Sequence, residues 1–205
     1  MFLKSMKTLP YFLLFVKVSC NISIMKKIAT IYEKDVYPNK IVDESIKYSD
    51  RITGKAIAIN DKNQIALVGN KQNEFLQLPG GGIDEGEDIK MGIIRECLEE
   101  IGYSVIILEE IGCIDDYRPR DKKHCINYCY LVKVSDQGGN FKHTQDESSI
   151  GMYTKWVDLK EAFDIFGKQK EELEAGKVTF YNTGFNILRD FLFLNEMKVN
   201  QKNNR

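Results

Sequence analysis

The residues best suited to chemistry in this 205-residue chain are three carboxylates, Glu96, Glu99 and Glu100, in a segment predicted to be helical. A helix brings residues three and four apart onto one face, so these side chains share a surface. Like charges in this arrangement repel each other by roughly a few tenths of a kcal/mol per pair. A hard divalent cation between them removes the repulsion, and Mg²⁺ prefers oxygen ligands. The spacing therefore predicts a divalent-metal site.

A glycine-rich segment, Pro79 to Glu87, directly precedes the helix and reads PGGGIDEGE. Four glycines and one proline within eight residues disfavour both helix and strand, so we expect a loop. Residues without a side chain allow the backbone to approach a ligand closely. A carbonyl oxygen of this loop can therefore complete the coordination of the same cation.

The helix itself is predicted from about Asp88 to Ile101. Asp88 is suited to the N-cap, and Gly102 stands where a left-handed residue commonly ends a helix. At about 100° per residue, one face is apolar and carries Ile94, Cys97, Leu98 and Ile101. Arg95 lies four residues before Glu99 and can hold that carboxylate in place.

The loop and the helix together resemble the Nudix box, Gly-x5-Glu-x7-Arg-Glu-U-x-Glu-Glu-x-Gly-U, in which U is a bulky apolar residue. Cys97, the less usual choice, and Tyr103 fill the U positions. Every fixed position of the box is filled, by Gly81, Glu87, Arg95, Glu96, Glu99, Glu100 and Gly102. The plainer interpretation is a solvated acidic helix face after a flexible loop, and a match at so many fixed positions disfavours it.

The resemblance implies an α/β (α+β) fold, the Nudix-type α/β/α sandwich with a mixed β-sheet, over residues 50–198. The pattern of apolar residues and turns predicts the strands within it, at 55–59, 64–68, 75–78, 104–112, 127–134 and 153–157. The first two of these strands are expected to form a hairpin, and residues 115–123 a polar loop. Helices are expected from Asp158, over 167–177 and over 180–197.

The flanking segments are less regular. Lys4 and Lys7 precede a short apolar run, so residues 1–24 are either a secretory leader or an upstream extension before a start at Met25. We favour the extension, because the rest of the chain suits the cytosol. Residues 25–49 are expected to be a lead-in or an edge hairpin, and 199–205 a frayed, flexible tail.

Composition restricts the class of protein. The formal net charge is −1 with 29% charged residues, which gives no signature of binding to polyanions, so we expect neither nucleic-acid nor membrane partners. The five cysteines are odd in number and include no Cys-x-x-Cys pair, so a disulfide framework or a zinc site is poorly supported. We therefore expect a cytoplasmic protein, and a homodimer is left open.

The family resemblance assigns roles to the acidic residues. Glu96 and Glu100 would be the principal ligands of Mg²⁺, for which Mn²⁺ can substitute, and Glu99 and the Gly81 carbonyl would assist. Either Glu99 or Glu147 would accept the proton from the attacking water, although Glu147 reads equally well as a solvated loop carboxylate. Two further residues of the box, Glu87 and Arg95, would shape the junction between loop and helix.

The substrate expected from the resemblance is a small nucleotide, cleaved at its diphosphate. Segments at 117–120, 128–131 and 189–194 look like those of MutT-like relatives. The favoured substrate is therefore a nucleoside triphosphate, which can be an oxidised one, cleaved to monophosphate and pyrophosphate. ADP-ribose or another nucleotide sugar is the alternative, and a non-catalytic nucleotide-binding domain is an alternative of another class. Arg118 and Arg120 can contact phosphates, although a run of charges is more often solvated surface.

Overall fold

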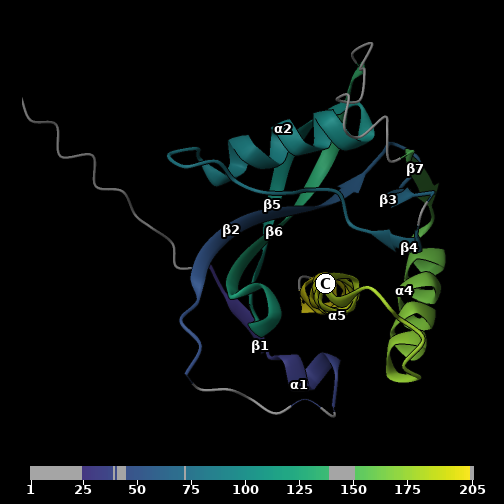
Figure 1. Cartoon of the computed structure of the whole chain (residues 1–205). Coiled ribbons are helices and arrows are strands. Elements are labelled where there is room, and N and C mark those ends of the chain that lie inside the picture. Colours follow the sequence, from purple (N-terminus) through teal and green to yellow (C-terminus); the bar gives the residue numbers. More distant parts are fainter. Residues whose placement is uncertain (1–24, 39, 41–44, 72, 139–150, 204–205) are drawn as a thin grey trace, which may run out of the picture.

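A seven-stranded mixed sheet with helices on both faces forms the centre of the computed structural model, which describes residues 25–38, 40, 45–71, 73–138 and 151–203. The sheet has the order β1-β5-β6-β2-β3-β4, and β7 pairs with β3. Figure 1 shows α2 on one face of the sheet and α5, seen end-on, on the other. The predicted arrangement of a mixed sheet between helices is confirmed.

The elements are β1 (Lys27–Ile31), α1 (Glu33–Val36), β2 (Ser49–Ile59), β3 (Ile65–Asn70), β4 (Asn73–Gln77), α2 (Ile89–Ile101), β5 (Tyr103–Arg118), a 3₁₀ turn (Pro119–Asp121), β6 (Lys123–Gly138), β7 (Met152–Val157), α4 (Leu159–Glu174) and α5 (Tyr181–Asn203).

The two longest strands form a hairpin that reaches into a segment predicted to be a loop. β5 runs antiparallel to β6 as far as the pair Arg118↔Lys123, and only the 3₁₀ turn separates them. The expectation of a polar loop over residues 115–123 is therefore wrong. Asp116 and Arg118 are both buried in β5 and bond to each other, so their polarity does not require exposure to water.

Strand β3 has a different main partner from the predicted one. The expected hairpin between β2 and β3 is reduced to one antiparallel pair, Ile59↔Ile65, because the two strands diverge beyond the turn. Instead β3 pairs along its whole length with β7. The divergence leaves one side of β2 without a neighbouring strand, and the glycine-rich loop takes that place, since Pro79 and Gly81 accept hydrogen bonds from the amides of Ala56 and Gly54.

The segment before the predicted domain also joins the sheet. β1 pairs in parallel with the C-terminal half of β5, from Lys27↔Cys113 to Ile31↔Asp116, and so supplies an edge strand without a hairpin. At the other end, α4 is one continuous helix where two were predicted. α5 continues to Asn203, beyond the predicted end at residue 197.

Two apolar clusters hold the helices to the sheet. Toward α2 the sheet presents small side chains such as Ala56 and Ala58, which pack with Ile93 and Cys97. Toward α4 and α5 it presents larger ones such as Ile57, which packs with buried phenylalanines, namely Phe166, Phe185 and Phe193. Alternate residues of β2 thus point to opposite faces, as the period of a strand requires. Phe185 lies in the core, and Trp156 packs at the edge of the α2 cluster.

The cysteines within the described residues are free thiols. Cys97, Cys125 and Cys129 are buried and Cys113 is half-buried, which suits small hydrophobic side chains. Burial raises the pKa of the Cys129 thiol well above its ordinary value, so this side chain stays protonated. Among the described residues, no helix has both the length and the hydropathy needed to cross a membrane.

Two glycines inside helices should respond oppositely to alanine. At Gly167, in α4, an added Cβ meets no described atom within 4 Å, so Gly167→Ala should stabilise the protein by about 0.5–1 kcal/mol. At Gly184, in α5, it would lie 2.6 Å from Tyr37 Oη and 2.7 Å from Val36 Cγ1. Gly184→Ala should therefore destabilise the protein, by roughly 1–3 kcal/mol for an overpacked site. Urea unfolding of both variants measures this, and equal shifts would contradict the packing of α1 on α5.

Candidate active site

Helix α2, which carries the acidic residues, has the predicted ends. The carboxylate of Asp88 accepts hydrogen bonds from the amides of Lys90 (3.0 Å) and Met91 (3.1 Å), as an N-cap does. Gly102 follows the last turn with φ 75°, in the left-handed region, and its amide donates to Leu98 O. The predicted N-cap and C-terminal glycine are confirmed, and together they set where the acidic face begins and ends.

The guanidinium of Arg95 connects this helix to the glycine-rich loop. It donates two parallel hydrogen bonds to Glu87, Nε to Oε1 at 3.0 Å and Nη2 to Oε2 at 2.9 Å. Nη2 also donates to the carbonyl of Gly82 at 2.9 Å. Nη1 donates to Glu96 (2.8 Å) and to Glu99 (3.1 Å), which is the expected contact four residues along the helix. Bidentate, charge-assisted bonds of this kind fix geometry as well as charge.

The loop approaches the acidic face so closely that it requires glycine. The amide of Gly80 donates to Glu100 Oε2 at 2.6 Å. A Cβ on Gly81 would lie 2.5 Å from Glu96 Oε2, and one on Gly80, whose φ is 125°, would collide with the carbonyl oxygen of Gly54. The predicted close approach of the loop backbone to the carboxylates is therefore present at Gly80 and Gly81.

The three carboxylates differ in how they are held. Glu96 has 12% of its side chain exposed, and burial raises its pKa while the bond from Arg95 opposes the rise. Glu99 is more open at 28%. Within the described part of the chain, no three His, Cys, Asp or Glu side chains converge in metal-binding geometry, and Arg95 lies between Glu96 and Glu99. The donors are nevertheless hard oxygens on partly desolvated carboxylates beside a loop carbonyl, which fits a divalent cation such as Mg²⁺.

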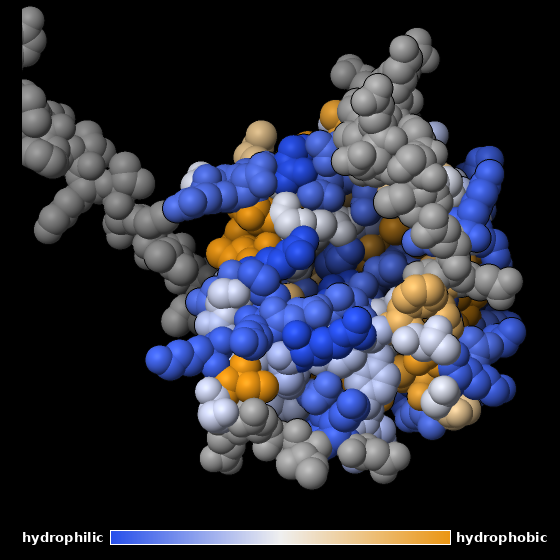
Figure 2. All heavy atoms as spheres, in the orientation of Figure 1, coloured by the Kyte–Doolittle hydropathy of each residue, from blue (hydrophilic) through white to orange (hydrophobic). Residues whose placement is uncertain are grey.

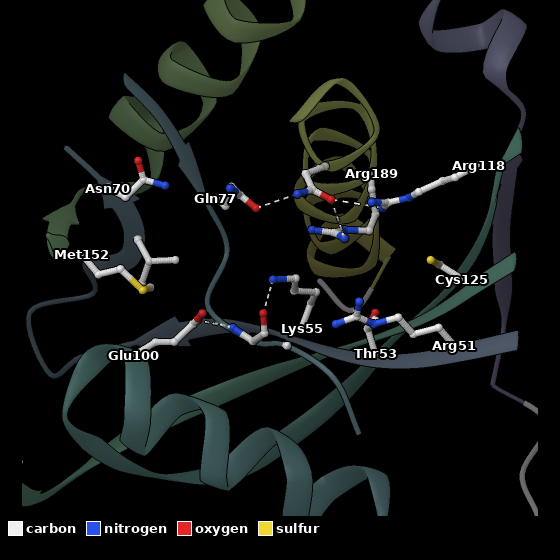
Figure 3. A pocket seen from close by; sticks show the side chains of 15 residues that line it. Arg51, Thr53, Lys55, Asn70, Gln77, Glu100, Arg118, Cys125, Met152 and Arg189 are labelled. Atoms are coloured by element: carbon white, nitrogen blue, oxygen red, sulfur yellow. Dashed lines mark hydrogen bonds between the residues drawn. The ribbon is translucent and has the colours of Figure 1, made fainter. Parts of the chain in front are cut away.

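A cavity of about 260 Å³ opens beside the acidic face. Glu100 lines one end of it, and Arg118 and Cys125 line the other (Figure 3). Gly80, whose amide bonds to Glu100, and Gly81 also line the cavity. The cavity lies where β2 and β3 diverge, and its walls come from strands β2 to β7 and from α2 and α5. In Figure 2 the region of this face between α2 and α5 is mostly hydrophilic. Glu100 thus belongs both to the acidic face and to the cavity wall.

A buried lysine between loop and cavity was not anticipated from the sequence. Lys55 Nζ donates to the carbonyls of Leu78, at 3.2 Å, and of Gly80. Burial lowers the pKa of Lys55, and the nearby guanidinium of Arg189 lowers it further. The available signal was a lysine at an inward-facing position of an apolar strand, KAIAI, where a charge is rarely buried without a function or a partner.

The inner wall of the cavity is a network of buried polar side chains from β2, β5, β6 and α5. Arg118 donates to both carboxylate oxygens of Asp116, at 2.6 and 3.1 Å. Asn127 Nδ2 donates to the same carboxylate at 2.9 Å, and its Oδ1 accepts from Thr53 at 2.6 Å. On α5, Arg189 Nε donates to Asp190 at 2.8 Å. Asn127 and this Arg189–Asp190 pair were missed by sequence reasoning, although polar residues at inward positions of a strand and a helix were a signal.

The remaining predicted site residues lie in different places. Arg118 is buried and lines the cavity, where a solvated loop had been expected. Arg120 is exposed in the 3₁₀ turn with its guanidinium 5.3 Å from the ring centre of Tyr181, and it does not line this cavity. Glu147, the second candidate proton acceptor, lies outside the described residues.

Comparison with known proteins identifies the class. A sequence model of the NUDIX domain matches residues 51–181, a span that includes the loop, α2 and all the cavity-lining residues except those on α5. Because this match covers more than half of the chain, the protein belongs to the Nudix family.

Individual relatives are more distant. A putative 8-oxo-dGTP diphosphatase of Bacillus subtilis is 37% identical over 68 residues, which cover 33% of this chain and 46% of the relative, so the chain spans about half the length of that protein. An RNA pyrophosphohydrolase of Ruthia magnifica is 28% identical over 162 residues, which cover 70% of this chain and 83% of the relative. A solved Nudix hydrolase of Nitrosomonas europaea superposes with a TM-score of 0.48 at 20% identity, covering 57% of this chain and 78% of that one.

The Arg95–Glu87 pair leads to a test of stability against pH. The side-chain bonds from Arg95, together with the bond from the Asp84 amide, lower the pKa of Glu87 from 4.5 to about 2. A depressed pKa stabilises the folded state above the unfolded value, near 4.5, and this contribution is lost as the pH falls toward 2. Glu87→Gln should therefore be less stable than the parent at pH 7, and the difference should shrink between about pH 5 and pH 3.

Urea midpoints at pH 7, 5, 4 and 3 measure this difference. Glu85→Gln, an exposed glutamate in the same loop, is the matched control and should follow the parent protein at every pH. A difference between Glu87→Gln and the parent that stays constant from pH 7 to pH 3 would show that the folded protein does not hold the pKa of Glu87 down.

Proposed function

We propose that this protein is a Mg²⁺-dependent pyrophosphohydrolase that cleaves nucleoside triphosphates to monophosphate and pyrophosphate. The observation that carries the proposal is the position of Glu100. Its side chain belongs to the acidic face of α2, and it also lines a cavity that contains three arginines and a lysine. A substrate bound in this cavity would therefore place its phosphates beside the carboxylates.

The metal would be held by Glu96 and Glu100, assisted by Glu99 and the Gly81 carbonyl. When bound, the ion neutralises phosphate charge and lowers the pKa of a bound water, so that attack at phosphorus becomes feasible near neutral pH. Mn²⁺ supplies the same chemistry with similar oxygen ligands. The raised pKa of Glu96 has burial as its main cause, and a nearby cation would offset that effect.

The other residues of the site would hold the carboxylates in position, accept a proton from the attacking water and contact the phosphate oxygens. Arg95 holds Glu99 and Glu96 at fixed positions through Nη1. Glu99, the more open of these two carboxylates, accepts the proton of the attacking water in this proposal. Glu147 keeps the same role as an alternative. Arg51, exposed at the cavity beside Gly82, is the side chain placed to contact phosphate oxygens, while Arg120 points to Tyr181.

The choice of triphosphate over ADP-ribose has support from two sides. The relative with the highest identity among those described above carries the name 8-oxo-dGTP diphosphatase. The end of the cavity nearer the loop has two basic side chains, Arg51 and Lys55, which suits a substrate with a high negative charge. A non-catalytic domain is disfavoured because all the acidic positions of the box are intact.

Replacement of one proposed ligand should separate activity from folding. Glu100→Gln keeps an oxygen that can accept from the Gly80 amide but removes the negative charge. We expect kcat/KM to fall by roughly 100-fold or more, since even outer-shell partners of metal sites cost 10–100-fold. Glu85→Gln, exposed in the neighbouring loop, should retain the parent activity. Turnover is measured together with circular dichroism, and near-normal turnover by a folded Glu100→Gln protein would refute the assignment.

Product analysis decides the substrate class. With Mg²⁺, triphosphates should yield monophosphate and pyrophosphate in equal amounts, because the bond cleaved lies between the α and β phosphorus atoms. ADP-ribose, tested at the same enzyme concentration, should be a poorer substrate. If kcat/KM for ADP-ribose exceeds that of every triphosphate tested, ADP-ribose or another nucleotide sugar is the substrate class.

A further inference from the structure

The inner end of the cavity contains a buried donor that lacks an acceptor. Arg189 is 3% exposed, and its Nη2 bonds to none of the described residues. The rest of its guanidinium is engaged, with Nε on Asp190 at 2.8 Å and Nη1 on Asn186 (3.1 Å) and Asn127 (3.3 Å). Buried polar groups almost always have a partner, so the acceptor comes from outside the described residues, as a water in the free protein or as a ligand atom in a complex.

A second donor is fixed beside it by a chain of hydrogen bonds. Arginines can only donate, so Asn186 must turn Oδ1 toward Arg118 and Arg189, each at 3.1 Å. Its Nδ2 then donates to Gln77 Oε1 at 3.0 Å, the hydrogen bond drawn as a dashed line at Gln77 in Figure 3. This orientation leaves Gln77 Nε2 as a donor, and within the described part of the chain it has no acceptor. The side chains of Gln77 and Arg189 both line the cavity.

The charges of this inner wall are already balanced. Asp116 takes two hydrogen bonds from Arg118, and Asp190 pairs with Arg189. Paired guanidinium groups retain N–H donors but little net charge, so they suit a neutral acceptor better than a phosphate. The unbalanced cations, Arg51 and Lys55, stand nearer the loop and the carboxylates.

We propose that the inner end of the cavity binds the edge of a 6-oxopurine, and that Arg189 and Gln77 are the residues that determine this specificity. A 6-oxopurine offers two adjacent acceptors, O6 and N7, for two donors. A 6-aminopurine keeps the N7 acceptor but turns an N–H toward the other donor, so that N–H and that donor are both left unpaired, which is how polar sites reject analogues. The inference deepens the proposed function, on which it depends for the identity of the substrate as a nucleotide.

The test uses ITP and ATP, which share sugar and triphosphate and differ at the 6-substituent and at the N1 proton. With the full chain and Mg²⁺, kcat/KM for ITP should exceed that for ATP by at least about tenfold, the lower range for polar discrimination of one base. Gln77→Glu keeps an acceptor for Asn186 but replaces the free donor with an acceptor, so the ITP/ATP ratio should fall at least about tenfold. Gln77 is only half-buried, so this variant should fold.

Gln64→Glu is the matched control. Gln64 Oε1 accepts from Asn60 Nδ2 at 3.0 Å, the same amide contact at the same distance, in a turn away from the cavity. It should leave the ITP/ATP ratio unchanged. Arg189→Lys provides a second variant, read only if its unfolding is cooperative, and it should also lower the ratio. ATP accepted as well as ITP by the parent, or an unchanged ratio in a folded Gln77→Glu protein, would overturn the proposal.

Binding of IMP and AMP separates this inference from the proposed reaction, because neither contains a phosphoanhydride bond. Calorimetric titration of the parent should show tighter binding of IMP, and Gln77→Glu should remove the preference. If no triphosphate is hydrolysed but IMP is preferred, the base site stands and the proposed function fails. If triphosphates are hydrolysed without preference for ITP, and IMP and AMP bind equally, the base site fails and the function stands.

Discussion

The guanidinium of Arg95 is the side-chain group that joins the glycine-rich loop to helix α2 at the most points. A segment with four glycines in eight residues loses much conformational entropy when it becomes ordered, so something must hold it. Arg95 does so with bonds to Glu87 and to the Gly82 carbonyl on the loop, and to Glu96 and Glu99 on the helix. One cation therefore helps to order the loop and also offsets the repulsion between the carboxylates.

The space beside this unit follows from how β2 is paired. β6 pairs with β2 along one side, whereas β3 leaves the other side after one pair. The freed amides of Gly54 and Ala56 are satisfied by carbonyls of the glycine-rich loop, and Thr53 forms an isolated bridge with Gly82. Because buried amides need acceptors, the same bonds that complete β2 also set the position of the loop carbonyls. The loop thus behaves as a short irregular strand at the edge of the cavity.

The two faces of the sheet carry different kinds of side chain. Alanines on the α2 side let the acidic helix approach closely, and apolar side chains form the core there. On the α5 side, apolar packing gives way near the cavity to Asp116, Arg118, Asn127 and the Arg189–Asp190 pair. Removal of one partner from such a pair leaves a buried charge, which costs far more than a surface ion pair is worth. That side is therefore rigid and directional, which suits recognition of a neutral group.

Sequence alone determined the loop, the extent of α2 with both caps, and the contact of Arg95 with Glu99. Each rests on local rules, since glycine content, capping residues and a spacing of four involve neighbours in the chain. The strands of the central sheet were also recognisable from their apolar pattern. The fold was expected from the resemblance to the Nudix box and not from the strand pattern, because the pattern does not show which strands pair with each other.

Only the tertiary structure decided which strands meet and which charges are buried. β1 joins β5, and β3 pairs mainly with β7, although their partners are distant in the sequence. Arg118 had the appearance of a solvated loop residue, but it lies in a strand because Asp116 and Asn186, the latter 68 residues away, satisfy its guanidinium. Whether a charged side chain is buried depends on partners supplied by other elements, and no local signal in a single sequence reports them.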